Sequence, residues 1–99
     1  DVAEEEDAKT LPETFSLRQN APNPFNPTTE IRYQLPEASH VELAVYDMRG
    51  RKVQVLVDRF VKAGYRSVMW EAEEVASGLY FVRMEAGEFV AVRKMVVVR

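Results

Sequence analysis

Apolar and polar residues alternate in short segments along this chain, a period-2 pattern that predicts β-strands covered on one face. The clearest segments are residues 28–35 and 40–46, whose shared apolar face would consist of Ile31, Tyr33, Leu35, Val41, Leu43 and Val45. Further strands are expected at residues 14–19, 52–57 and 65–70. Residues 77–99 are predicted to form a hairpin of two strands, rich in β-branched and aromatic residues, with its turn at residues 85–88.

Turn signals separate the predicted strands. Asp47 can accept hydrogen bonds from nearby backbone amides and Gly50 can take a positive φ, so residues 47–50 predict a hairpin turn. Gly78 opens the sixth strand, and Gly87 lies in the turn before the seventh. Seven short strands without a long helix predict an all-β fold, a seven-stranded antiparallel Ig-like β-sandwich, with a small barrel as the alternative.

Two aromatic residues are the expected anchors of the core. Trp70 is expected to contribute more buried area than any other side chain. Phe25 is expected to plug one end of the core, from a crossover at residues 20–27 that three prolines keep stiff. Asn23 and Asn26 are expected to hydrogen-bond nearby backbone and so hold the turns of this crossover.

Three stretches break the strand pattern. Residues 55–57 are consecutive apolar residues, which predicts a β-bulge. Residues 58–64 are expected to form a looser connection. Residues 71–76 are predicted to form at most one helical turn, which is too short to be stable by itself.

The 99-residue chain has room for one domain with one modest core, because a chain of this size buries only about two-thirds of the surface that it exposes when unfolded. Residues 1–13 carry six acidic residues and one basic residue, the composition of a flexible acidic linker. Residues 14–99 are therefore the expected folded domain. Because the sequence begins with Asp1 rather than Met, we expect it to be a piece of a longer protein.

Charge and cysteine content exclude several classes of function. Residues 14–99 hold ten acidic and twelve basic residues, an excess too small for nucleic-acid binding. No apolar run approaches the roughly 20 residues that a membrane-spanning helix needs. Cysteine is absent, which excludes disulfides, thiolate metal ligands and a cysteine nucleophile.

The residue types used in catalysis are present but not in a catalytic pattern. His40 follows Ser39, yet adjacency in sequence does not place a nucleophile against its base. The glutamates within residues 71–74 are expected to form a solvated loop rather than the paired acids of a glycosidase. Asp47 and Asp58 lack the spacing of a calcium loop, and a weak surface calcium site stays open. We expect no catalytic residue, no metal ligand set and no cofactor.

A planar row of exposed aromatic residues would favour a carbohydrate-binding module. The candidates for such a row are Tyr33, Tyr46, Tyr65 and Tyr80. Their positions within predicted strands favour packing in the core or across strands instead. A carbohydrate-binding or structural Ig-like module appended to a secreted glycosidase is the alternative function.

Five motifs occur in order along the chain. They are Asn-Pro-Phe-Asn-Pro-Thr-Thr-Glu-Ile-Arg-Tyr-Gln-Leu-Pro at 23–36, Val-Tyr-Asp-Met-Arg-Gly-Arg-Lys-Val at 45–53, Val-Met-Trp at 68–70, Ala-Ser-Gly-Leu-Tyr-Phe-Val-Arg-Met at 76–84 and Arg-Lys-Met-Val-Val-Val-Arg at 93–99. In this combination, residues 15–99 resemble the C-terminal sorting domain of type IX secretion cargo. The same pattern is similar to the Ig-like module of flagellar hook-capping proteins.

The resemblance implies a non-catalytic module at the end of a larger exported protein, which passes through the periplasm and then becomes attached to the cell surface or secreted. The implied partners are the type IX outer-membrane translocon, a sortase-like peptidase and a covalently linked upstream cargo domain. Weak pairing of two copies through an edge strand is left open.

The resemblance also assigns roles to residues. The candidates for recognition by the translocon form the terminal basic and aliphatic strand, Arg93, Lys94, Met95, Val96, Val97, Val98 and Arg99. The residues of the structural motifs are Asn23, Pro24, Phe25, Asp47, Gly50, Trp70, Gly78, Tyr80 and Gly87. Because an edge strand offers unpaired backbone groups to another sheet, we expect the terminal strand to be recognised along its edge.

Overall fold

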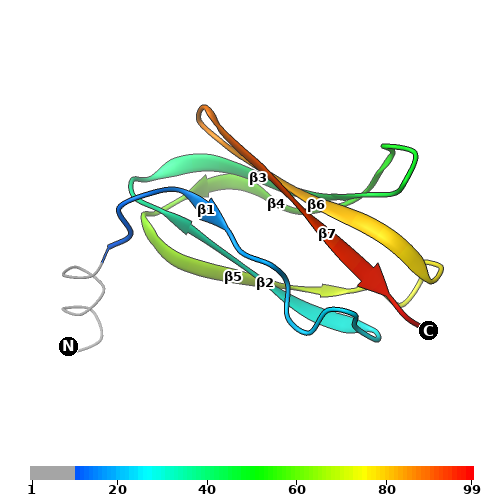
Figure 1. Ribbon diagram of the computed structural model, residues 1–99. Helices are drawn as coiled ribbons and strands as arrows, with labels where there is room; N and C mark the ends of the chain where they lie inside the picture. Colours follow the sequence, from blue (N-terminus) through cyan, green and yellow to red (C-terminus); the bar gives the residue numbers. More distant parts are fainter. Residues whose placement is uncertain (1–10) are drawn as a thin grey trace.

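Seven antiparallel strands form two stacked sheets in the computed structural model, which describes residues 11–99 (Figure 1). The strands are β1 (Ser16–Leu17), β2 (Thr28–Leu35), β3 (Ser39–Tyr46), β4 (Lys52–Val61), β5 (Gly64–Glu71), β6 (Gly78–Ala86) and β7 (Phe89–Val97). The predicted all-β sandwich is confirmed, and the two separate sheets exclude a closed barrel. Of the predicted linker, residues 1–10 lie outside the described residues.

The strand order places β7 at one side of the molecule. One sheet has the order β1-β2-β5 and the other the order β4-β3-β6-β7. Hence β7 has one strand neighbour, β6, with which it pairs from Gly78↔Val97 to Ala86↔Phe89. Strands β4 and β5 are consecutive in sequence but belong to different sheets, and each lies at an edge of its sheet.

The core lies between the sheets and is built from alternate residues of each long strand, as the sequence pattern predicts. Trp70 is fully buried in it. The Trp70 ring lies 5.5 Å from the ring of Phe25 and 5.7 Å from that of Tyr80, measured between centroids, and the Tyr80 contact is edge to face. The Trp70 indole N–H donates to Gln54 Oε1 at 3.1 Å, so the one polar atom of this side chain is satisfied. The predicted plug at Phe25 is therefore confirmed.

Asp47 organises the turn between β3 and β4. Its Oδ1 atom accepts from the backbone N–H groups of Arg49 and Arg51, each at 2.9 Å, and its Oδ2 atom accepts from Arg51 Nε at 2.9 Å. Gly50 completes the turn at φ +82°, a value that side chains with a Cβ rarely adopt. These hydrogen bonds, led by that from the Arg51 backbone, hold the pKa of the Asp47 carboxyl below its ordinary value.

Strand β4 confirms one expectation and corrects another. Leu43 pairs with Val57 and Ala44 with Val55, so Leu56 is the extra residue of the predicted bulge. The expected loose connection after residue 57 is wrong, because β4 continues to Val61 in register with β3. That extension depends on pairing between distant segments, which local composition does not report.

Residues 71–76, which could make at most one unstable helical turn, form no helix. This segment is an irregular turn in residues 11–99, which contain no helix. The Ala72 N–H donates to the Pro27 carbonyl at 2.8 Å, and the carbonyls of Ala72 and Val75 accept from the Arg99 guanidinium. These long-range contacts satisfy backbone groups that a helix would have satisfied locally.

Replacing Trp70 by Ala is expected to lower the free energy of unfolding by about 3–5 kcal/mol, the cost of a large buried cavity. The matched control is Met69→Ala, because Met69 precedes Trp70 in β5, points to the opposite face and is 55% exposed. That control should change the free energy by no more than about 0.5 kcal/mol. Urea denaturation of both variants measures the difference, and equal losses would contradict the proposed core.

The Asp47 turn is expected to stabilise the fold only while the carboxyl is ionised. Since the pKa of Asp47 is lower in the folded chain, its contribution is present above the unfolded pKa of about 3.9 and is lost as pH falls through the folded value. Thermal unfolding of the wild type and Asp47→Ala should therefore differ at pH 6 and converge near pH 2. A difference that does not depend on pH would contradict this account.

Candidate functional site

The seven candidate recognition residues lie on β7 and just after it, where strand alternation divides them into two groups. Met95 and Val97 point inward and are buried in the core. Lys94 and Val96 point to the opposite, outer face of the sheet, with Lys94 exposed and Val96 half-buried. The candidates are thus one continuous segment in sequence but two faces in the structure.

Two of the three basic residues in this segment are held by the fold itself. The Arg93 Nε donates to the Leu17 carbonyl at 2.8 Å. Arg99 donates its backbone N–H to Ser77 Oγ at 2.9 Å and its guanidinium to the Val75 carbonyl at 3.1 Å. Among residues 11–99, Lys94 takes part in none of the ion pairs. Lys94 is therefore the basic side chain of this segment that remains available to a partner.

The outer backbone edge of β7 is covered near its end, contrary to the expectation of an open edge. The covering segment is residues 17–25, which we call the strap. The Phe25 N–H donates to the Val96 carbonyl at 3.1 Å, and the Val98 N–H donates to the Phe25 carbonyl at 3.0 Å. The Val96 N–H donates to Asn23 Oδ1 at 2.9 Å. Asn23, which was expected to bond nearby backbone, thus accepts from a residue far away in sequence.

A network of side-chain hydrogen bonds, centred on the buried Asn20 and Thr29, holds the strap in place. Asn20 donates to Thr29 Oγ1 at 3.0 Å and to the Pro22 carbonyl at 3.1 Å, and Thr29 Oγ1 donates to the same carbonyl at 2.8 Å. Gln19 Nε2 donates to Asn20 Oδ1 at 2.7 Å and to the Lys94 carbonyl at 2.6 Å. The network thus connects β2 to β7 through the strap.

Sequence reasoning missed Gln19 and Asn20. A signal was present, because prolines supply carbonyl acceptors but no N–H donors, so the carbonyls of a proline-rich segment depend more on side-chain donors such as nearby amides.

The residues of the structural motifs fall into separate groups rather than one site. Asn23 and Phe25 belong to the strap, with the exposed Pro24 between them. Asp47 and Gly50 form the β3–β4 turn, and Asp47 lines a shallow pocket with Gly78 and Tyr80.

The remaining motif residues have structural positions as well. Trp70 and Tyr80 are buried partners in the core, and the Tyr80 hydroxyl donates to the Ala76 carbonyl at 2.8 Å. Gly78 opens β6, and Gly87 occupies the β6–β7 turn at φ +59°.

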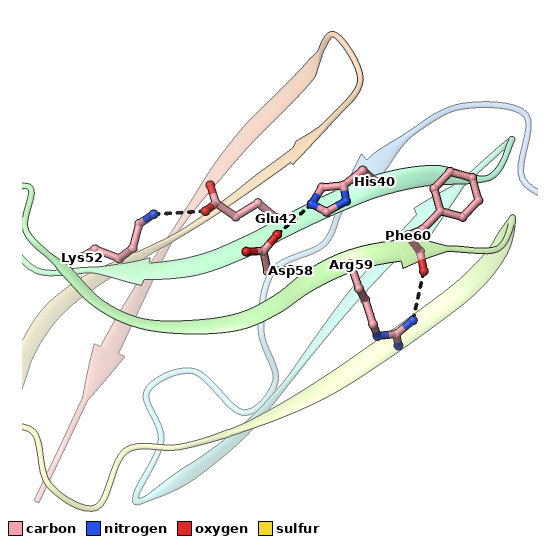
Figure 2. Close-up of polar contacts among 6 residues, drawn as sticks. All are labelled: His40, Glu42, Lys52, Asp58, Arg59 and Phe60. Atoms are coloured by element: carbon pink, nitrogen blue, oxygen red, sulfur yellow. Dashed lines mark hydrogen bonds and ion pairs between the residues drawn. The ribbon is translucent and has the colours of Figure 1, made fainter.

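The residues considered for catalysis are not assembled into a catalytic arrangement. Ser39 Oγ donates to the Glu37 carbonyl at 3.1 Å, while His40 Nε2 lies 2.7 Å from Asp58 Oδ1. Figure 2 shows this His40–Asp58 pair on β3 and β4, and both side chains are more than half exposed. Glutamates 71, 73 and 74 are exposed, and within residues 11–99 no group of three His, Cys, Asp or Glu side chains could hold a metal ion.

The four tyrosines do not form a planar exposed row. Tyr33 and Tyr80 are buried, and burial raises the pKa of the Tyr33 hydroxyl. The Tyr46 ring is partly covered by the Lys52 ammonium, 5.9 Å from its centroid. Tyr65, at 59% exposure, is the tyrosine that a ligand could reach most readily. Packing explains the other three, as the sequence pattern favours.

A family model described as the secretion system C-terminal sorting domain matches residues 21–98. The match begins within the strap and includes all of β2 to β7. No curated protein and no solved structure matches the chain significantly.

The described residues 11–99 contain no helix that could serve as a transmembrane segment.

Replacing Asn23 by Ala removes the acceptor for the Val96 N–H, so this amide is expected to exchange with solvent about fivefold faster. Asn26→Ala is the control, since Asn26 is also an exposed asparagine before a proline. Hydrogen exchange followed by NMR measures the Val96 amide in each variant. Unchanged exchange in Asn23→Ala would show that the strap does not protect β7.

Proposed function

The chain belongs to the secretion system C-terminal sorting domain family, and from this premise we propose which partners it meets and which residues they contact. The family carries the sorting signal of type IX secretion, so the domain interacts with secretion machinery and is attached to a cargo protein that is exported across the outer membrane. The proposed direct partner is the outer-membrane translocon, met after the cargo has entered the periplasm.

The proposed contact region is the terminal segment Arg93–Arg99. Its support is the end position of β7 in the four-stranded sheet, which leaves the outward side chains of this segment accessible while the strap covers its backbone edge. The free Lys94 side chain lies within it. The inward residues Met95 and Val97 act indirectly in this proposal, because they hold the strand in the core.

We also propose that the domain is non-catalytic, and that a sortase-like peptidase separates it from its cargo in the acidic segment 1–13. The support is the exposed, separated arrangement of His40 and the loop glutamates, together with family membership. The cargo then becomes anchored at the cell surface or secreted. The carbohydrate-binding alternative is not favoured, because three of its four candidate tyrosines are packed rather than displayed.

Weak pairing of two copies is a separate proposal that concerns β4. This strand lies at the sheet edge opposite β7 and exposes Val53, Val55 and Phe60. The Arg59 guanidinium donates to the Phe60 carbonyl at 3.3 Å (Figure 2), which occupies an acceptor that a second strand would use. Such a contact weakens pairing through this edge.

Fusing the full chain to a folded periplasmic reporter is expected to move the reporter to the surface or medium of a type IX-competent cell. Fractionation measures the share exported, with a strain lacking the translocon as the control. Retention of the reporter in the periplasm of competent cells would reject the proposed function. Deleting residues 94–99 is a poor test, because it removes Met95 and Val97 from the core and is expected to unfold the domain.

A further inference from the structure

Strand β7 is apolar on both faces, which is unusual for a strand of a sheet with one solvated face. Its inward side packs against the core through Phe89, Met95 and Val97. Its outward side carries Val90 and Val92, which are 48% and 50% exposed. A strand covered on one side only is expected to have polar residues at these outward positions, so the second apolar row indicates a partner.

The outward row of β7 continues onto β6. Cross-strand pairing places Leu79 opposite Val96 and Phe81 opposite Lys94. Leu79 and Phe81 are partly exposed, whereas their neighbours Tyr80 and Val82 are buried. The same pairing places Arg83 opposite Val92 and Glu85 opposite Val90. The outer surface of the β6–β7 hairpin is therefore an apolar row on β7 that contains Lys94, beside a β6 row that contains Leu79, Phe81 and the paired charges of Arg83 and Glu85.

Charges on the rest of this sheet face have partners within the fold. On β3 and β4, Lys52 Nζ lies 3.1 Å from Glu42 Oε2, and His40 pairs with Asp58 (Figure 2). On β6, the Arg83 guanidinium lies 3.5 Å from Glu85. Within residues 11–99, Lys94 on β7 has no such carboxylate. An incoming acidic group would thus find its partner on β7 rather than on β3 or β4.

Addition of a partner strand to β7 is opposed by the strap. Residues 23–25 already bond the Val96 and Val98 amides and the Val96 carbonyl, and Gln19 bonds the Lys94 carbonyl. A partner would have to displace these bonds to read the backbone of this segment. The outward side chains can be contacted without any such change.

We propose that the secretion machinery binds the outer face of the β6–β7 hairpin, centred on Val90, Val92, Lys94 and Val96, through an apolar surface that presents a carboxylate to Lys94. This inference rests on the proposed function and specifies its contact. It extends the contact to two valines outside residues 93–99 and assigns Met95 and Val97 to the core. Apolar contact supplies affinity, and the lysine supplies orientation and selectivity.

A second copy of this chain fits the same face less well. Face-to-face packing of two copies would bring Lys94 to the interface twice, and the outward row of β7 contains no acidic residue to meet it. The acidic residue of the adjoining β6 row, Glu85, already pairs with Arg83. Burial of an unpaired ammonium group is costly. The observed charges therefore favour a partner of different sequence.

The first test reverses the charge of Lys94 in the full chain fused to the reporter. If Lys94 only keeps an apolar edge soluble, glutamate serves as well as lysine, and export is unchanged. If Lys94 meets a carboxylate, Lys94→Glu should lower export roughly tenfold while Lys94→Arg preserves it. The control is Lys62→Glu, an equal charge change at an exposed site after β4. Wild-type export from Lys94→Glu would overturn the proposal.

The second test removes apolar surface while keeping the β-branched shape. The double variant Val90→Thr/Val92→Thr is expected to lower export severalfold, with the unfolding temperature of the purified chain within about 2 °C of the wild type. The control is Val53→Thr/Val55→Thr, a second pair of exposed valines two residues apart, on β4. Equal export from both double variants would contradict a docking face on β7.

Two further outcomes are informative. If the wild-type fusion itself stays in the periplasm, both the proposed function and the proposed docking face are rejected. If the wild type is exported and the face variants are exported equally, the docking face alone is rejected. Sedimentation of the purified chains covers the alternative occupant: a dimer that the face variants dissociate without loss of export would assign this face to self-association and overturn the proposal.

Discussion

The inward residues of β7 connect the stability of this domain to its function. Met95 and Val97 lie beneath the four-stranded sheet with Trp70 and Tyr80, so the core is incomplete without the last strand. Because side chains alternate along a strand, fixing the inward set also fixes Val92, Lys94 and Val96 on the outer face. A register slip of one residue would exchange the two sets. Burial in the core therefore determines what β7 can present to a partner.

The strap adds a second constraint, which acts on the backbone instead of the side chains. Phe25 inserts its ring against Trp70 while its own N–H and C=O bond to β7. The same residue thus anchors the core and covers the edge. The covered edge protects the domain from unintended strand pairing, which an exposed apolar edge strand otherwise invites. Recognition through side chains is compatible with this protection. Addition of a partner strand along the covered segment is not, because it would displace the strap.

On the outer face of the four-stranded sheet, most charges are paired within the fold, and Lys94 on β7 is left for a partner. The pairs on β3 and β4 are exposed and each contributes little to stability. Their effect on binding is to leave no uncompensated charge there. Lys94 differs because its neighbours are Val92, Val96 and Phe81, none of which can neutralise it. Family membership supplies the reason for a partner, and this arrangement indicates where that partner binds.

The sequence by itself determined the elements of this protein. Period-2 alternation identified β2 and β3 because each is covered on one face, and the five ordered motifs identified the family. The division of residues 93–99 into buried and outward members was implicit in the same alternation. It could not be assigned from the sequence, since these residues are mostly apolar on both faces.

Tertiary structure decided the contacts between distant segments. The bonds of Asn23 and Gln19 to β7, the extension of β4 to Val61 and the docking of Arg99 on the 72–75 turn all join residues far apart in sequence. Local propensity depends on neighbouring residues only, so it cannot determine which distant carbonyl an amide will meet. These partners are determined only when the two sheets stack and the strap connects one sheet to β7 of the other.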